Sequence, residues 1–119
     1  MEQRPLGRTG RSIPAIALGC VTFGREIDED TSYRIMDYAM EHGITLFDTA
    51  EAYGGGQSQI TRSTSLGIND QREVTTEMSS SENIVGRWME KRNIRKKVTL
   101  ITKFKKILSS RNERKNIKD

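Results

Sequence analysis

Three short apolar runs, separated by stretches with helical periodicity, dominate the hydrophobic pattern of this chain. The runs are predicted to be strands, and they lie at Ala15–Leu18, Ile44–Phe47 and Val98–Thr102. Each interval between them contains apolar residues three and four positions apart, which is the spacing of one buried face on an α-helix. Because strand–helix–strand is the unit of a parallel sheet, the pattern predicts an α/β fold.

The predicted helices carry typical start and stop residues. Asp28 or Asp30 can cap the first helix with a side-chain oxygen, and Gly43 is a natural stop. The second helix is expected to begin at a capping box formed by Ser79 and Glu82. The two apolar stripes consist of Ile35, Met36, Ala39 and Met40, and of Ile84, Val85, Trp88 and Met89.

Glycine-rich and polar segments flank these elements. Residues 6–13 are expected to form a hairpin turn between two short strands. Residues 19–25 form a glycine-bearing loop, where a flat ligand could approach the backbone closely. Residues 54–80 form a long polar connection with little periodicity, and such connections are usually either functional or disordered.

Charge is distributed unevenly along the chain. The 119 residues have a net charge of +4, and only 34% of them are hydrophobic, so the core can only be small. Acidic and basic residues balance over residues 1–103, so the whole excess of positive charge lies in residues 104–119. These last residues are expected to form a basic, disordered tail.

Cysteine content and hydropathy narrow the class of protein. Cys20 is the only cysteine, so no internal disulfide and no cysteine-rich zinc site can form, and no metal site is expected. No apolar run approaches membrane-spanning length, and the N-terminus lacks the apolar core of a signal peptide. We therefore expect a cytoplasmic protein without a membrane partner.

The pattern places three ionisable residues at one edge of the sheet. Asp48 ends the second strand, Tyr53 follows on the next loop, and Lys103 ends the third strand. A phenol has an ordinary pKa near 10, which a neighbouring ammonium lowers, and a carboxylate can hold that ammonium in place. Tyr53 could then act as a general acid toward a carbonyl oxygen, with the hydride supplied by a cofactor because no side chain donates one.

Each of these residues also has an ordinary structural interpretation. Asp48 could cap a turn, Tyr53 could be a surface aromatic residue, and Lys103 could simply begin the solvated basic run. Each residue alone is therefore weak evidence, and only their joint placement favours chemistry.

The segment Ile44–Gly54 resembles the aldo-keto reductase signature, in which a strand-end Asp is followed by Thr-Ala and then by Tyr-Gly. The resemblance covers residues 4–103 in order, with further matches at Leu6–Gly10, Leu18–Gly24, Ser81–Gly86 and Val98–Lys103. It implies a (β/α)8 TIM barrel with an N-terminal hairpin closing its floor, and reduction of a carbonyl with NADP(H) or NAD(H). A complete barrel takes about 250 residues. We therefore expect an incomplete N-terminal part with the hairpin, about three strands and two helices.

The resemblance also assigns roles to individual residues. Asp48, Tyr53 and Lys103 match three of the family's four catalytic positions, and Tyr53 is the proton donor. The fourth is a histidine at the end of the fourth strand, whereas His42 is expected at the end of the first helix. The residues that match positions near the nicotinamide end of the cofactor are Gly19, Cys20, Val21, Thr22, Phe23 and Asp48.

These matches predict a carbonyl reductase that is truncated and inactive as this chain, since the later strands and their cofactor loops are not present. The intact form would act on a small carbonyl compound. Open sheet edges would leave the chain marginally stable, prone to aggregate, or dependent on a second chain for the remaining strands. The alternative is a non-catalytic binding module whose basic tail contacts nucleic acid or an acidic partner. That tail lacks the interleaved aromatic residues of single-strand binders, which counts against nucleic acid.

Overall fold

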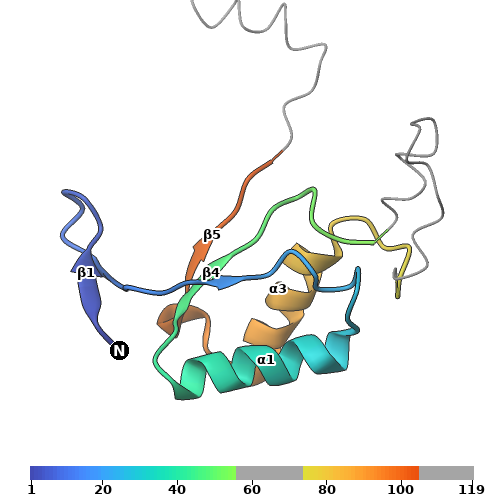
Figure 1. Ribbon diagram of the computed structural model, residues 1–119, viewed down its shortest axis with the longest axis horizontal. Coiled ribbons are helices and arrows are strands. Elements are labelled where there is room, and N and C mark those ends of the chain that lie inside the picture. Colours follow the sequence, from blue (N-terminus) through green and yellow to red (C-terminus); the bar gives the residue numbers. More distant parts are fainter. Residues whose placement is uncertain (56–73, 105–119) are drawn as a thin grey trace, which may run out of the picture.

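The computed structural model describes residues 1–55 and 74–104, which form a hairpin followed by a parallel sheet and two helices (Figure 1). In the hairpin, β1 (Gln3–Pro5) pairs antiparallel with β2 (Ser12–Pro14). The sheet contains β3 (Leu18–Gly19), β4 (Leu46–Asp48) and β5 (Thr99–Ile101). The helices are α1 (Glu29–Glu41) and α3 (Ser80–Arg92), and a short 3-10 turn, η2 (Arg95–Lys97), precedes β5. The predicted α/β pattern is thereby confirmed.

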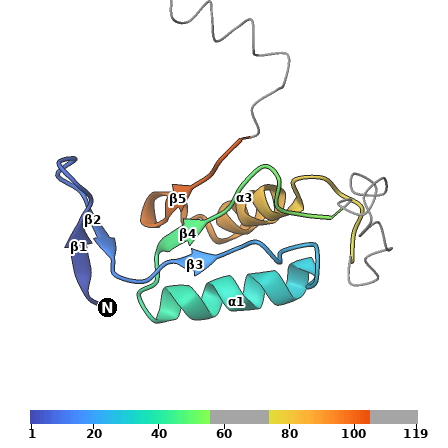
Figure 2. The ribbon, with the colours of Figure 1, turned by 45° about the horizontal axis from the view of Figure 1, so that its top comes forward.

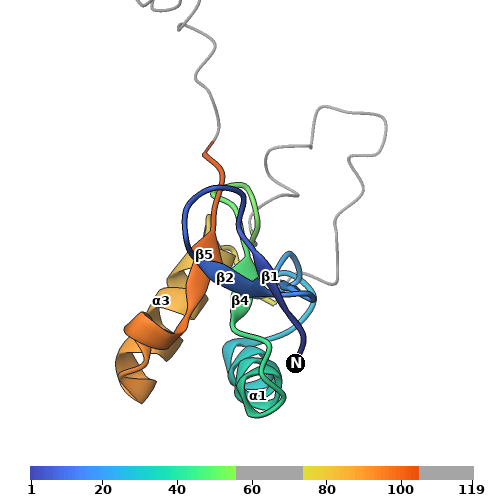
Figure 3. The same ribbon diagram turned by 90° about the vertical axis from the view of Figure 1, so that its left-hand side faces the viewer.

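Strand order shows how the chain winds. The three strands are parallel and lie in the order β3-β4-β5, so both crossovers move in the same direction along the sheet. Because crossovers are right-handed, two steps in one direction place both helices on the same face. Figure 3 shows α1 and α3 together on one side of the strands. A doubly wound sheet reverses direction and covers both faces, whereas this single direction is the winding of a (β/α)8 barrel.

The hydrophobic core lies between the sheet and the two helices. Phe47 of β4 packs against Trp88 of α3 with 5.4 Å between ring centroids and the rings tilted by 34°, and Met36 of α1 is buried in the same cluster. All three side chains are 0% exposed. Both predicted apolar stripes are confirmed, because each contributes buried residues to this cluster.

The opposite face of the sheet carries the predicted site. Side chains alternate along a strand, so Gly19, Asp48 and Ile101, which are in register, lie away from the helices. Neither of the described helices lies on this face (Figure 3), and Ile101 is 45% exposed, whereas Leu46, two positions before Asp48, is 6% exposed. Among the described residues, the predicted uncovered face is therefore open toward the ends of the strands, where Ile101 lies, but not at Leu46 near the start of β4.

The two helices begin differently. Asp28 caps α1 as predicted, since its carboxylate accepts the Thr31 N–H at 2.8 Å. The predicted capping box of α3 is wrong. Ser79 has a left-handed backbone with a φ of 57°, and its Oγ donates to the Glu51 carbonyl at 2.7 Å, so it caps no N–H of α3.

Strand positions also differ from the sequence prediction. The first two strands begin later than expected, at Leu18 and Leu46, and the third is shorter than its apolar run. An apolar run indicates that a strand is present, whereas hydrogen bonding to the adjacent strand decides at which residues the strand begins and ends.

The hairpin lies at the end of the sheet where the strands begin (Figure 2). The Met1 side chain lies close to Gly43, which follows α1 and precedes β4, because a Cβ added at Gly43 would be 2.9 Å from Met1 Cβ. This is the place expected for a hairpin that closes the floor of a barrel. Most of the predicted polar connection, residues 54–80, and nearly all of the predicted basic tail, residues 104–119, lie outside the described residues. In the described segments, no helix has the length and apolar character needed to cross a membrane.

Candidate active site

Asp48 and Lys103 meet at the edge of the sheet where the strands end. β4 and β5 pair in parallel with Asp48 opposite Ile101, so Lys103 leaves β5 beside Asp48. Its Nζ lies 2.5 Å from Asp48 Oδ1. The side chains of Lys103 and Asp48 are 50% and 40% exposed, so water screens the pair. The contact therefore fixes the position of the ammonium group more than it stabilises the fold.

The protonation of Lys103 follows from this contact. The hydrogen bond to Asp48 raises the pKa of Lys103 above its ordinary value, and Tyr53 contributes in the same direction. Lys103 is therefore an ammonium group throughout the neutral pH range. The edge of the sheet holds a fixed positive charge.

Tyr53 lies on the loop after β4 and faces this ammonium group. Its ring centroid is 5.0 Å from Lys103 Nζ, which is within the range of a cation–π contact. Its backbone N–H donates to Ala50 and its carbonyl accepts from Ser81, both at 3.1 Å. The structure thus brings Asp48, Tyr53 and Lys103 together around one nitrogen.

The loop after β3, predicted to border a cofactor, contains both exposed and buried positions. Gly19 and Val21 are exposed and Thr22 is half-buried, so these three can contact a ligand. The side chains of Cys20 and Phe23 are 0% and 1% exposed and belong to the core. Burial raises the pKa of the Cys20 thiol to about 12, so the thiol is neutral at physiological pH.

Comparisons with known proteins identify the family to which this chain belongs. Residues 15–119 match the family model described as the aldo/keto reductase family. The chain belongs to that family. It is 36% identical over 117 residues to YrpG of Bacillus subtilis (strain 168), an uncharacterized oxidoreductase, and the match covers 98% of this chain and 30% of YrpG.

Solved structures support the same assignment. Two structures from Pseudomonas aeruginosa, both assigned to the aldo-keto reductases, match with a TM-score of 0.57 at 30% and 28% identity. Each match covers 84% of this chain and 30% of the other. The chain thus spans about 30% of the length of these relatives.

Family membership defines the fold class of the described elements. The hairpin, the three strands and the two helices are the N-terminal part of a (β/α)8 barrel. The family match also includes residues 104–119, which the charge pattern assigns to a tail. The division of the chain at residue 103 stays a prediction.

His42 does not belong to the site. It is the C-cap of α1, is exposed, and its Nδ1 lies 2.9 Å from the Tyr38 carbonyl. α1 leads into the beginning of β4, whereas Asp48 lies at the end of β4. His42 is therefore at the other end of the sheet, as the sequence predicts.

Buried hydroxyl groups behind the site were missed by the sequence analysis. Thr49, Ser80 and Ser81 are each 0% exposed, and Thr49 directly follows Asp48. The spacing of Ser79 and of the glutamate three residues later suggested only a helix cap. Three consecutive serines, at positions 79 to 81, provide more hydroxyl groups than one helix cap can use. The two additional hydroxyl groups were the feature of the sequence that indicated further hydrogen bonds.

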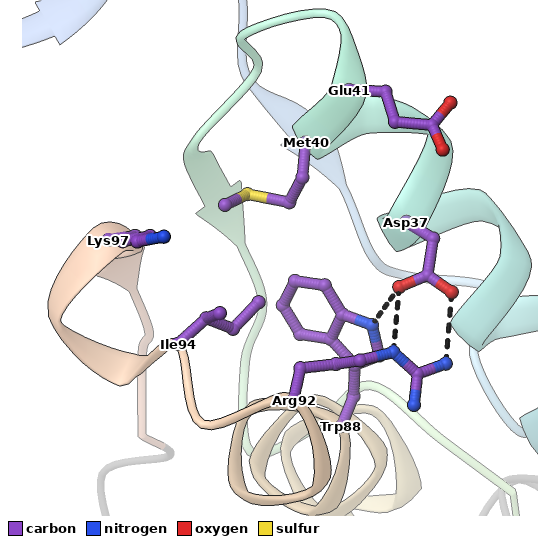
Figure 4. Close-up of a pocket in the computed structure, with 7 residues that line it drawn as sticks. All are labelled: Asp37, Met40, Glu41, Trp88, Arg92, Ile94 and Lys97. Carbon is purple, nitrogen blue, oxygen red and sulfur yellow. Dashed lines mark hydrogen bonds and ion pairs between the residues drawn. The ribbon is translucent and has the colours of Figure 1, made fainter.

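A second polar cluster lies between the helices (Figure 4). Trp88 Nε1 donates to Asp37 Oδ1 at 2.9 Å, and Arg92 binds both oxygens of Asp37 at 3.1 and 2.9 Å. The hydrogen bond to Arg92 lowers the pKa of the Asp37 carboxyl. The cluster borders a groove of about 540 Å³ that is also lined by Met40, Glu41, Ile94 and Lys97. None of the predicted site residues lines this groove.

Proposed function

We propose that this chain carries the proton-transfer residues of an NAD(P)H-dependent carbonyl reductase, with Tyr53 as the proton donor. One observation carries the proposal: the Lys103 ammonium lies 2.5 Å from Asp48 Oδ1 and 5.0 Å from the Tyr53 ring centroid. Membership of the aldo/keto reductase family supports the same reaction type. The proposed substrate is a small aldehyde or ketone, which is reduced to an alcohol.

The three side chains have separate tasks in the proposed step. The Tyr53 hydroxyl donates its proton to the carbonyl oxygen as negative charge develops there. The Lys103 ammonium, whose Nζ lies 5.0 Å from the Tyr53 ring centroid, stabilises the phenolate that remains, because opposite charges attract. Asp48 holds the ammonium in position and keeps it protonated.

When bound, a nicotinamide cofactor would provide the hydride for the carbonyl carbon. The described residues fit the nicotinamide end of NADP(H) or NAD(H). Gly19 is in register with Asp48, and a Cβ at Gly19 would meet no atom within 4 Å. A flat ring can therefore lie against this backbone, with Val21 and Thr22 on the adjacent part of the loop.

We further propose that the 119 residues alone do not turn over substrate. By family resemblance, the fourth catalytic residue follows a fourth strand, and the phosphates of the cofactor bind to later loops. The described residues contribute three strands to the sheet. We expect weak cofactor binding by this chain alone, and a second chain that carries the remaining strands could complete the site.

A graft tests the proposal. Residues 1–103 would replace the corresponding segment of YrpG, and carbonyl-dependent oxidation of NADPH and NADH would be followed with a panel of aldehydes and ketones, with unmodified YrpG as the reference. We expect the graft to be active and Tyr53→Phe to slow it by about 10²–10⁴-fold, the usual contribution of a general acid. Tyr38→Phe is the matched control, because Tyr38 is 64% exposed on α1.

Three results would contradict the proposal. A folded graft that is inactive, while YrpG itself is active in the same assay, would show that these residues do not support the reaction. An active graft that is insensitive to Tyr53→Phe would remove Tyr53 from the reaction. Robust turnover by the isolated 119-residue chain would show that the remaining strands are not required.

A further inference from the structure

We propose that Ser80 and Ser81, at the start of α3, are positioning residues that clamp together the two loops carrying Tyr53 and the predicted cofactor residues. This inference rests on the proposed function, which assigns the proton donor and the cofactor contacts to those loops. The start of α3 lies beside the loops after β3 and β4 (Figures 1 and 2), and both serines are bonded to both loops.

Ser81 links three points around the site. Its Oγ donates to the Cys20 carbonyl, in the loop after β3, at 2.7 Å. This bond uses its only hydroxyl proton, so Thr49 must be the donor in the 2.7 Å contact between Thr49 Oγ1 and Ser81 Oγ. The Ser81 N–H donates to the Tyr53 carbonyl at 3.1 Å. Ser81 therefore connects the cofactor loop, the residue next to Asp48, and the backbone of the proposed proton donor.

Ser80 makes a second link between the same loops. Its Oγ donates to the Phe23 carbonyl at 2.9 Å and accepts the Gly55 N–H at 3.1 Å. Gly24 and Gly54 pack against it with φ of +82° and +155°. A Cβ at Gly24 would lie 2.2 Å from Ser80 Oγ, and one at Gly54 would lie 2.4 Å from Ser80 N. Glycine is thus needed at both positions for the loops to approach α3 this closely.

Burial restrains the hydrogen bonds of Thr49, Ser80 and Ser81 to one arrangement. The hydroxyl-bearing residues Thr49, Ser80 and Ser81 are each 0% exposed, so a hydroxyl that lost its partner would have no water to replace it. The side chains of Asp48 and Lys103 are 40% and 50% exposed, so packing restrains them much less. The buried hydroxyl groups therefore hold the two loops in place, and Asp48 positions the Lys103 ammonium.

NMR spectroscopy of the full chain tests the clamp. In the wild type we expect a nuclear Overhauser contact between the Tyr53 ring and the Lys103 ε-methylene group, given the 5.0 Å from centroid to Nζ. Ser81→Ala is expected to cause loss of this contact, because it leaves the buried Thr49 hydroxyl and the Cys20 carbonyl without their partner. Ser32→Ala is the matched control, because Ser32 is equally buried but its Oγ donates to Asp28 within the first turn of α1. The control is expected to leave the contact unchanged.

A second variant keeps the test decisive if Ser81→Ala does not fold. Thr49→Val has the same shape as Thr49, and it removes only the hydroxyl that donates to Ser81, so a smaller loss of the contact is expected. An unchanged contact in the variant that folds, an equal loss in Ser32→Ala, or a wild-type chain that lacks the contact would overturn the proposal.

The measurement requires neither cofactor nor turnover. An unaffected Tyr53–Lys103 contact would therefore reject the clamp and leave the reductase proposal standing. An inactive graft would reject the reductase proposal and leave the clamp standing.

Discussion

The Lys103 ammonium lies 2.5 Å from Asp48 Oδ1, although 55 positions separate the two residues in the chain. Parallel pairing of β4 and β5 creates this contact by bringing the ends of the two strands together. Parallel pairing in turn requires a crossover, which α3 provides. The pair is therefore present only when the sheet has formed. It links the fold of the chain to the proposed chemistry.

Asp48→Asn removes the carboxylate that raises the pKa of Lys103, so this pKa is expected to fall toward its ordinary value of 10.5. Because the folded-state pKa is raised, the associated stability is fully present below 10.5 and is lost as the pH rises through the folded-state pKa. The variant should therefore lose less stability at alkaline pH than the wild type. Titration of the Lys103 ε-carbon by NMR measures the shift, with Asp30→Asn on exposed α1 surface as the control. An unchanged Lys103 titration would refute the pairing.

Asp37 is expected to contribute to the loss of stability at acid pH. Its pKa is lowered by Arg92, so its contribution is present above the ordinary carboxyl pKa and is lost as the pH falls through the lowered value. Asp37→Asn should therefore flatten the acid side of the stability profile. Urea unfolding at several pH values provides the measurement. A profile as steep as that of the wild type would count against this role.

Trp88 is predicted to be the most costly single truncation in the core. Its side chain is 0% exposed, stacks on Phe47 and donates to Asp37. Trp88→Ala is expected to lower the free energy of unfolding by about 3–5 kcal/mol, as large-to-small core substitutions do. Val74→Ala is the control, because Val74 is 50% exposed and should change stability by no more than about 0.5 kcal/mol. Equal unfolding midpoints for the two variants would contradict the proposed core.

Cys20 is expected to be unreactive in the folded chain. Its thiol is fully buried and its pKa is raised to about 12, so very little reactive thiolate forms at neutral pH. Alkylation by iodoacetamide, followed by mass spectrometry, should be slow in buffer and fast in urea. Rapid labelling under native conditions would place Cys20 outside the core.

Much of this arrangement was predictable because it follows from periodicity and topology. The helical spacing of Met36 and Trp88 identifies the buried faces, and both residues are in the core. Parallel strands end at a common edge, so placing Asp48 and Lys103 at strand ends was sufficient to predict that they meet. Neither step required knowledge of side-chain contacts.

The clamp could not be predicted in the same way. The Ser81 hydroxyl bonds to Cys20, 61 positions earlier, and the Ser79 hydroxyl bonds to Glu51, 28 positions earlier. Local propensity assigns serines at a helix start to capping, because it takes no account of distant carbonyl groups. The close approach of the loops to α3 changes the partners of these hydroxyls.

The central claim is that Tyr53 and Lys103 act as one proton-transfer unit, and a double-mutant cycle in the YrpG graft tests it most directly. Carbonyl reduction would be compared for Tyr53→Phe, Lys103→Met and the double variant. Residues that act together lose their joint effect when either is removed. We therefore expect the double variant to be about as slow as the slower single variant. Rate losses that multiply in the double variant would show that Tyr53 and Lys103 act independently, and would contradict the account.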